Sequence, residues 1–164
     1  KFFKNTNVDL KIFRPFTVYG TFARPDMIFV TYLKKVYKKE KFYLYNNGEY
    51  TRDFTYVDDV CEILKRFIKI GKIRGNIINI CSSKPIKIKK ILPIIDLYNL
   101  KRSRVENKPL RKGEMIKTYG NNNLLKKYVK FKKFTGIRAG VKKTVKWYNN
   151  FEQKKILEFK KVKY

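Results

Sequence analysis

Histidine is missing from the 164-residue sequence, and cysteine occurs only twice, as Cys61 and Cys81. Without an imidazole no Ser-His-Asp or Cys-His arrangement can form, which excludes the nucleophilic enzymes that depend on one. The two cysteines lie in apolar segments and lack the spacing of zinc ligands. We therefore expect structural thiols and no metal site.

Carboxylates are also scarce, since 13 Asp and Glu stand against 41 Lys and Arg, which gives a formal net charge of +28. A charge of this size favours nucleic acid or another polyanion as a partner. However, only nine of the basic residues are Arg, and Lys is spread along the chain with Asn, Ile, Tyr and Phe, which share A/T-rich codons. We interpret most of the charge as solvated surface that favours phosphate-bearing substrates, and keep a nucleic-acid-binding module as the less favoured alternative.

No stretch approaches the ~18 consecutive apolar residues of a membrane-spanning helix, and the first residues show no cleavable signal pattern. We therefore expect a cytoplasmic location and no membrane partner. With 43% hydrophobic and 16% aromatic residues, the chain can bury one core of ordinary size.

Residues 51–59, TRDFTYVDD, combine two patterns that favour a strand running directly into a helix. Polar and apolar side chains alternate in the first half, and acidic residues precede a helically spaced apolar series in the second. Asp58 or Asp59 is placed to cap the first turn, and Arg52 can present a fork of donors to an anion. The apolar series on one helical face comprises Val60, Ile63, Leu64, Phe67 and Ile68.

The rest of the sequence alternates between strand-like and helix-like segments, which indicates an α/β protein. Asn47-Gly48 predicts a hairpin, Pro93 a kink or restart of its helix, and Asn121 or Asn122 a helix cap. Residues 16–27 should form a loop. Strands are expected near residues 8–13, 41–46, 50–55, 76–80 and 102–108, and helices near 27–39, 57–70, 88–99, 124–128 and 137–151.

Together with the 51–59 stretch, the motifs RPFTVYG at residues 14–20 and RPDM at 24–27 resemble the extended short-chain dehydrogenase/reductase family. Within it the sequence is most like the UDP-glucuronate 4-epimerases, from about residue 8 to about 148, and it matches only the second half of such an enzyme. The resemblance implies the C-terminal part of a Rossmann-type fold, with the last sheet strands and the smaller α/β substrate-binding domain. It also implies NAD as the cofactor of a complete enzyme and a UDP-sugar as its substrate.

In this scheme residues 1–19 and 53–82 belong to the Rossmann sheet and its helix, 20–52 and 83–151 to the substrate-binding subdomain, and 152–164 to a Lys-rich tail. The sequence starts after the family's catalytic Tyr-x-x-x-Lys pair, and it contains no Gly-rich cofactor turn. We therefore expect the N-terminal dinucleotide-binding half and all catalytic residues to be absent. The chain could be a fragment, a split-gene product or a decaying reading frame, and in each case we expect it to be inactive alone. We also expect its sheet to expose apolar edges, which favours association with the missing half or with a second copy as a homodimer.

The resemblance also implies ligand contacts for nine residues in four groups. Phe16 would lie beside the nicotinamide, Thr17 and Arg24 would hold the sugar carboxylate, Leu44, Tyr45 and Asn46 would line the base, and Arg52, Arg111 and Glu114 would contact the diphosphate and ribose. All of these residues except Phe16 also have an ordinary alternative. Thr17 could close a turn, Arg24 could be a solvated loop charge, residues 44–46 could belong to a plain hairpin, Arg52 could pair with Asp53 or an exposed carboxylate, and residues 111–114 could form a surface turn.

Two other enzymes would share the Arg52 and Arg111 positions, namely a nucleotide-sugar 4,6-dehydratase and a galactose-type 4-epimerase. Arg24 distinguishes them, because only a glucuronate substrate carries a carboxylate for its guanidinium.

Overall fold

The computed structural model describes residues 10–71, 73, 77–131 and 133–161, with side chains described up to residue 151. None of the helices in these ranges is both long enough and apolar enough to cross a membrane. In chain order the elements are β1 (Ile12–Pro15), β2 (Thr17–Tyr19), α1 (Ile28–Lys38), β3 (Phe42–Tyr45), β4 (Thr51–Arg52), β5 (Phe54–Tyr56), α2 (Val57–Ile68), β6 (Ile77–Ile80), β7 (Ile86–Lys87), α3 (Ile91–Asn99), β8 (Val105–Lys108), α4 (Asn123–Tyr128) and α5 (Ile137–Lys161).

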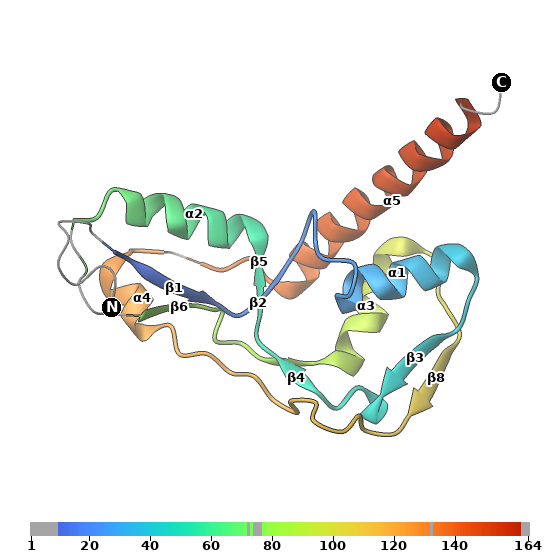
Figure 1. Cartoon of the computed structure of the whole chain (residues 1–164), viewed down its shortest axis with the longest axis horizontal. Coiled ribbons are helices and arrows are strands. Elements are labelled where there is room, and N and C mark those ends of the chain that lie inside the picture. The colour runs from blue at the N-terminus through green and yellow to red at the C-terminus, as the bar shows by residue number, and fades with distance from the viewer. Residues whose placement is uncertain (1–9, 72, 74–76, 132, 162–164) are drawn as a thin grey trace.

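Two lobes meet at β2 and β5 (Figure 1). The part built from β1, β6, α2 and α4 is called the sheet lobe here, and the part built from α1, α3, β3, β8 and the first turns of α5 the helical lobe. The far end of α5 projects away from both lobes. The molecule is thus an α/β protein, as the sequence predicts.

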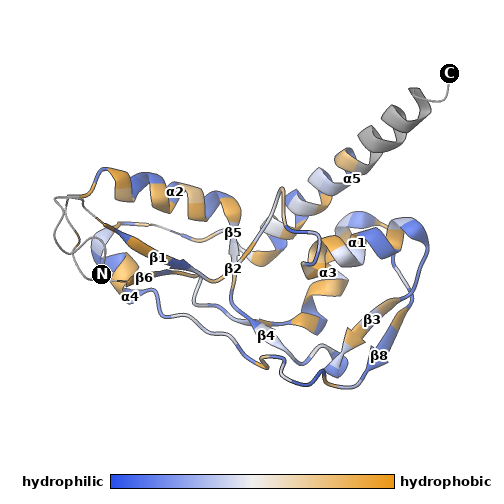
Figure 2. Ribbon diagram, in the orientation of Figure 1, coloured by the Kyte–Doolittle hydropathy of each residue, from blue (hydrophilic) through white to orange (hydrophobic). Residues whose placement is uncertain are grey.

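The strands form four two-stranded sheets, three of them parallel. β1 pairs with β6, β2 with β5 and β3 with β8 in parallel, while β4 and β7 are antiparallel. Parallel partners require long crossover connections, and helices supply them here. In the sheet lobe α2 lies between β5 and β6, and its amphipathic banding is visible in Figure 2.

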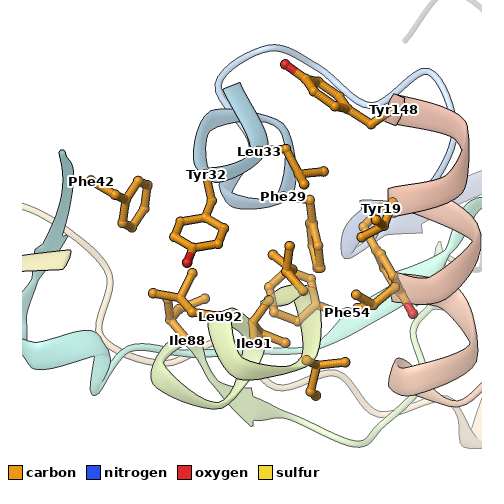
Figure 3. Packing of buried hydrophobic residues seen from close by; sticks show 14 of the residues in the cluster. Tyr19, Phe29, Tyr32, Leu33, Phe42, Phe54, Ile88, Ile91, Leu92 and Tyr148 are labelled. Atoms are coloured by element: carbon orange, nitrogen blue, oxygen red, sulfur yellow. The ribbon is translucent and has the colours of Figure 1, made fainter. Parts of the chain in front are cut away.

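Each lobe has its own apolar core. In the sheet lobe, α2 and α4 pack on β6 through Val60, Ile63, Phe67, Ile73, Ile78, Ile80, Leu125 and Val129. In the helical lobe, α1, α3 and α5 enclose a larger, aromatic-rich cluster that includes Tyr19, Phe29, Tyr32, Phe54, Ile91 and Tyr148 (Figure 3). The helical lobe therefore forms a rigid wall behind the strands that carry the site.

The spacing of apolar residues explains α1. Phe29, Tyr32, Leu33 and Val36 recur at helical intervals and are buried. The helix ends where Lys39 adopts a left-handed conformation with φ 55°, and its last turn is basic, which suits the negative end of the helix dipole.

The predicted hairpin through Asn47-Gly48 is wrong. Asn46, Asn47 and Gly48 all have positive φ and form a 3₁₀ turn, so the chain leaves β3 instead of folding back on it. As a result β3 pairs with β8, and β4 pairs with β7. A side chain at Gly48 would meet the Lys89 main chain at 2.8 Å, which explains the glycine.

Several local expectations also need correction in α2. Neither Asp58 nor Asp59 caps the helix, because the N-cap is Tyr56 without a side-chain cap bond, although both acids lie in the first turn. Ile68 is 81% exposed and leaves the apolar face. Cys61 is exposed, unlike buried Cys81, so only Cys81 fits a structural thiol.

Three further differences concern segment boundaries. The expected loop over residues 16–27 contains β2, and β7 went unpredicted because two residues show no periodicity. Residues 123–129, expected in the substrate-binding subdomain, pack into the sheet lobe through Leu125 and Val129. Asn122 is the N-cap of α4 but makes no side-chain cap bond, whereas Asn121 Oδ1 accepts the amide of the first helical residue, Asn123, at 2.8 Å.

Candidate functional site

A cavity of about 460 Å³ lies between α1, β3, β4 and the turn at residues 111–114. Four cationic side chains and two carboxylates line it, so it favours an anion. We call it the nucleotide cavity. Its lining is Thr17, Arg24, Asp26, Met27, Ile28, Thr31, Lys35, Phe42, Tyr43, Leu44, Tyr45, Tyr50, Arg52, Phe54, Ile88, Arg111 and Glu114.

Seven of the nine residues implied by the resemblance line this cavity, although they come from segments almost 100 positions apart. Phe16 lines a second cavity described below. Asn46 lines neither cavity, because it turns the chain away at φ 49°. The structure therefore brings Arg52 and Arg111 to one site.

Arg52 is held in place by main-chain oxygens. Its Nη1 donates to Thr51 O at 3.0 Å and to Ile116 O at 3.4 Å, and its guanidinium lies 5.5 Å from the centre of the Tyr50 ring. Nη2 lies 3.8 Å from Glu114 Oε1, and the side chain is only 18% exposed. Its acidic partner is thus Glu114 and not the neighbouring Asp53.

Arg111 stacks on an aromatic ring, with its guanidinium carbon 3.6 Å from the centre of the Tyr45 ring. Hydrogen bonding to Tyr45 is the main cause that raises the pKa of Arg111. The turn that carries it closes with the Glu114 amide donating to Arg111 O at 3.3 Å, and Gly113 adopts φ 78°, a conformation that favours glycine. Glu114 therefore lies 3.8 Å from Arg52 and also contributes to the electrostatic environment of Arg111.

A second cavity adjoins the first and shares Thr17, Arg24 and Met27 with it. We call it the sugar cavity, after the ligand group that the resemblance implies there. Phe16 and Gly20 line it, and Phe16 donates its amide to Ile80 O at 3.0 Å. A ligand in the nucleotide cavity can therefore extend past Thr17 toward Phe16.

Arg24 is already paired in the ligand-free chain. Its Nε and Nη2 donate to the two carboxylate oxygens of Asp26 at 3.1 and 2.8 Å, and the Arg24 side chain is 77% exposed. An exposed pair of this kind contributes little to stability. A ligand carboxylate would have to compete with Asp26 for this guanidinium.

Asp53 anchors several segments of the chain through hydrogen bonds, although from the sequence it was only a possible partner of Arg52. It is fully buried, and its carboxylate accepts from Ser82 N at 3.1 Å, Ser82 Oγ at 2.7 Å and Gly120 N at 3.1 Å. Its amide donates to Thr118 Oγ1 at 3.2 Å, and its carbonyl accepts the Thr17 amide at 3.2 Å. This one residue ties three separate segments, at residues 17, 82 and 118–120, to the strand that carries Arg52.

Sequence reasoning missed Tyr43, Tyr50 and Lys35, which also line the nucleotide cavity. Only the alternation of Phe42 and Leu44 with Tyr43 could have placed Tyr43 on the opposite face of β3. Tyr50 and Lys35 gave no signal, because an aromatic residue before a strand and a lysine in an amphipathic helix are both commonplace.

Known proteins resemble this chain in sequence and in structure. Residues 2–81 match the NAD dependent epimerase/dehydratase family. An uncharacterized protein of Methanocaldococcus jannaschii is 32% identical over 135 residues, covering 82% of this chain and 41% of that protein. A UDP-glucuronate 4-epimerase of Thermodesulfobacterium geofontis is 30% identical over 141 residues, covering 85% of this chain and 43% of the relative.

The crystal structure of a UDP-glucuronic acid 4-epimerase from Bacillus cereus in complex with UDP-glucuronic acid and NAD superposes with a TM-score of 0.82 and 25% identity. The match covers 90% of this chain and 48% of that one. The chain thus spans less than half the length of the relatives it matches. By sequence and by fold, it belongs to the NAD dependent epimerase/dehydratase family, that is, to the extended short-chain dehydrogenases/reductases.

Proposed function

We propose that this chain is the substrate-binding half of an NAD-dependent nucleotide-sugar epimerase, with UDP-glucuronate as the candidate substrate. The observation that carries the proposal is the presence of Arg52 and Arg111 in one cavity, with Thr17 and Arg24 where that cavity joins the sugar cavity. A diphosphate carries charge on two neighbouring phosphates, and two guanidinium groups are suited to bind it.

In this proposal each part of the ligand contacts a different set of cavity residues. The base would lie along Leu44 and Tyr45 of β3, the ribose near Glu114, and the diphosphate between Arg52 and Arg111. The sugar would extend past Thr17 into the sugar cavity, where its carboxylate would displace Asp26 from Arg24. Asn46 has no part in it, since it lines neither cavity.

The chemistry that NAD would supply in a complete enzyme is reversible hydride transfer at C4 of the sugar. The residues of this chain would bind the ligand, orient it and exclude water, and the Phe16 side would border the nicotinamide. Holding the diphosphate at a fixed point sets where the sugar ring lies, and so decides which carbon faces the cofactor.

Calorimetric titration of the 164-residue chain with UDP, UDP-glucuronate and uridine tests the proposal. Arg52→Gln and Arg111→Gln should each weaken UDP binding by about tenfold to hundredfold, as expected for loss of a charge-assisted contact, and should leave uridine binding unchanged. Arg138→Gln is the matched control, because Arg138 is an exposed residue outside both cavities. The proposal fails if wild-type protein does not bind UDP, or if both variants bind it as well as the control does.

Arg24 decides between a glucuronate and a neutral hexose. Arg24→Gln should weaken UDP-glucuronate binding more than UDP-glucose or UDP-galactose binding, because only the first carries the carboxylate. Equal losses for all three ligands would favour a 4,6-dehydratase or a galactose-type epimerase.

A further inference from the structure

The hydroxyl of Tyr50 is a buried polar group without a partner in the part of the chain that the structure describes. Tyr50 is 4% exposed and lines the nucleotide cavity. Buried hydroxyl groups almost always form a hydrogen bond, because leaving one unpaired costs free energy. An unpaired hydroxyl in the wall of a binding cavity therefore points to a ligand acceptor.

The position of Tyr50 indicates which part of a ligand that acceptor belongs to. Tyr50 precedes β4, and its ring centre lies 5.5 Å from the Arg52 guanidinium carbon. On the other side, Tyr45 is the main cause of the raised pKa of Arg111, and Glu114 and Tyr50 add smaller electrostatic contributions. The Tyr50 ring thus lies beside the Arg52 guanidinium, and Tyr50 also contributes to the electrostatic environment of Arg111.

Tyr19 provides an informative contrast. Its hydroxyl is also buried and unpaired within the described residues. However, this hydroxyl packs against α5, where a Cβ placed on Gly140 would come within 2.0 Å of it (Figure 3). Tyr19 lines the sugar cavity and not the nucleotide cavity. UDP lacks the sugar and would occupy the nucleotide cavity alone, so it should not reach the Tyr19 hydroxyl.

We propose that the Tyr50 hydroxyl donates a hydrogen bond to a phosphate oxygen held between Arg52 and Arg111. This inference rests on the proposed function and adds a neutral third donor to the two charged ones. A diphosphate offers several acceptor oxygens in different directions, so a fixed phenol can bind one that the planar guanidinium groups leave unpaired.

Access to this hydroxyl requires a small rearrangement, since less than 1 Å² of its oxygen is accessible in the ligand-free chain. Arg111 and Glu114 are best placed to make it, because both belong to the turn at residues 111–114, in which Arg111, Lys112 and Gly113 are exposed. A phosphate would replace the Glu114 carboxylate between the two guanidinium groups and so draw Arg111 off Tyr45.

The test compares wild-type chain, Tyr50→Phe and Tyr19→Phe by calorimetric titration with UDP and with uridine. Tyr50→Phe keeps the ring and removes only the oxygen, so UDP binding should weaken by about tenfold to hundredfold. Uridine binding should stay unchanged, and the Tm of the ligand-free variant should be equal or higher, because an unpaired buried group is gone. Tyr19→Phe should bind UDP as wild type does.

Each outcome separates this inference from the proposed function. If wild-type chain binds UDP and Arg52→Gln weakens it, but Tyr50→Phe binds UDP normally, the proposed function stands and the role of Tyr50 is refuted. An equal loss for UDP and uridine would also refute it, by placing the hydroxyl on the nucleoside or by showing a damaged cavity. If wild-type chain binds no UDP, both are overturned.

Discussion

Asp53→Ala should be among the most destabilising single substitutions in this chain. The Asp53 carboxylate is fully buried and accepts three hydrogen bonds, two from Ser82 and one from the Gly120 amide. Truncation to Ala removes both acceptor oxygens and with them all three hydrogen bonds. The loop after β6 and the segment at residues 118–120 would then lose their common attachment to the strand of Arg52.

The magnitude follows from the donors that lose their partners. The Ser82 amide keeps Thr55 Oγ1 at 3.1 Å, so only the Ser82 hydroxyl and the Gly120 amide are left unpaired. Each unpaired buried donor costs about 1–3 kcal/mol. Release of a buried charge offsets part of this, and we expect a net loss of about 2–5 kcal/mol. The free energy of unfolding of a protein is typically about 5–15 kcal/mol, so this loss is a large fraction of it.

Urea denaturation followed by circular dichroism measures this loss. Asp58→Ala is the matched control, since Asp58 is 61% exposed and lies 3.5 Å from Lys143, an arrangement worth ~0.5 kcal/mol or less. Asp53→Asn should fall between the two, because its amide keeps one acceptor. A loss for Asp53→Ala within about 1 kcal/mol of the control would refute the reasoning.

Three other predictions concern the cavities and α5. Glu114→Gln should strengthen UDP binding about threefold to tenfold in a titration at low salt, because the competing carboxylate beside the two arginines is removed; weaker binding would instead favour a ribose contact. Asp26→Asn should strengthen UDP-glucuronate binding and leave UDP binding unchanged, since it frees Arg24. Gly140→Ala should lower the free energy of unfolding by about 1–3 kcal/mol through its clash with the Tyr19 ring and hydroxyl. Tyr19→Phe in the same chain should restore only part of it, because the ring atom Cζ still lies 2.7 Å from the added Cβ.

The helices were predictable because their apolar residues repeat over several turns. The apolar face of α1 and the start of α2 at Val57 follow directly from such spacing. The pairing of strands could not be predicted in the same way, because it joins segments far apart in sequence. The local Asn47-Gly48 signal favoured a hairpin, which the three consecutive positive φ values at residues 46–48 prevent. Two-residue strands such as β7 carry no periodicity at all.

In the candidate site, too, some residues could be predicted from the sequence and others could not. Arg52 and Arg111 were recognisable because their motifs resemble a known family, and the structure brings them into one cavity. Tyr50 could not be recognised from the sequence, because the feature that singles it out is an unpaired buried hydroxyl. That feature depends on the residues around Tyr50 and not on its residue type. The sequence suggested Asp53 only as a possible partner of Arg52, whereas its carboxylate lies in the interior and binds Ser82 and Gly120.

In the 51–59 stretch, neighbouring residues point to different environments. Arg52 presents its guanidinium to the cavity, whereas Asp53 is buried and holds Ser82 and Gly120. Six residues later Asp59 accepts both the amide and the hydroxyl of Thr135, at 2.7 and 2.8 Å, and so fastens α2 to the segment before α5. The anion contact proposed for Arg52 requires a firmly held strand, and these two buried carboxylates anchor the residues that follow Arg52. The motif is therefore long because binding and anchoring are encoded in the same stretch.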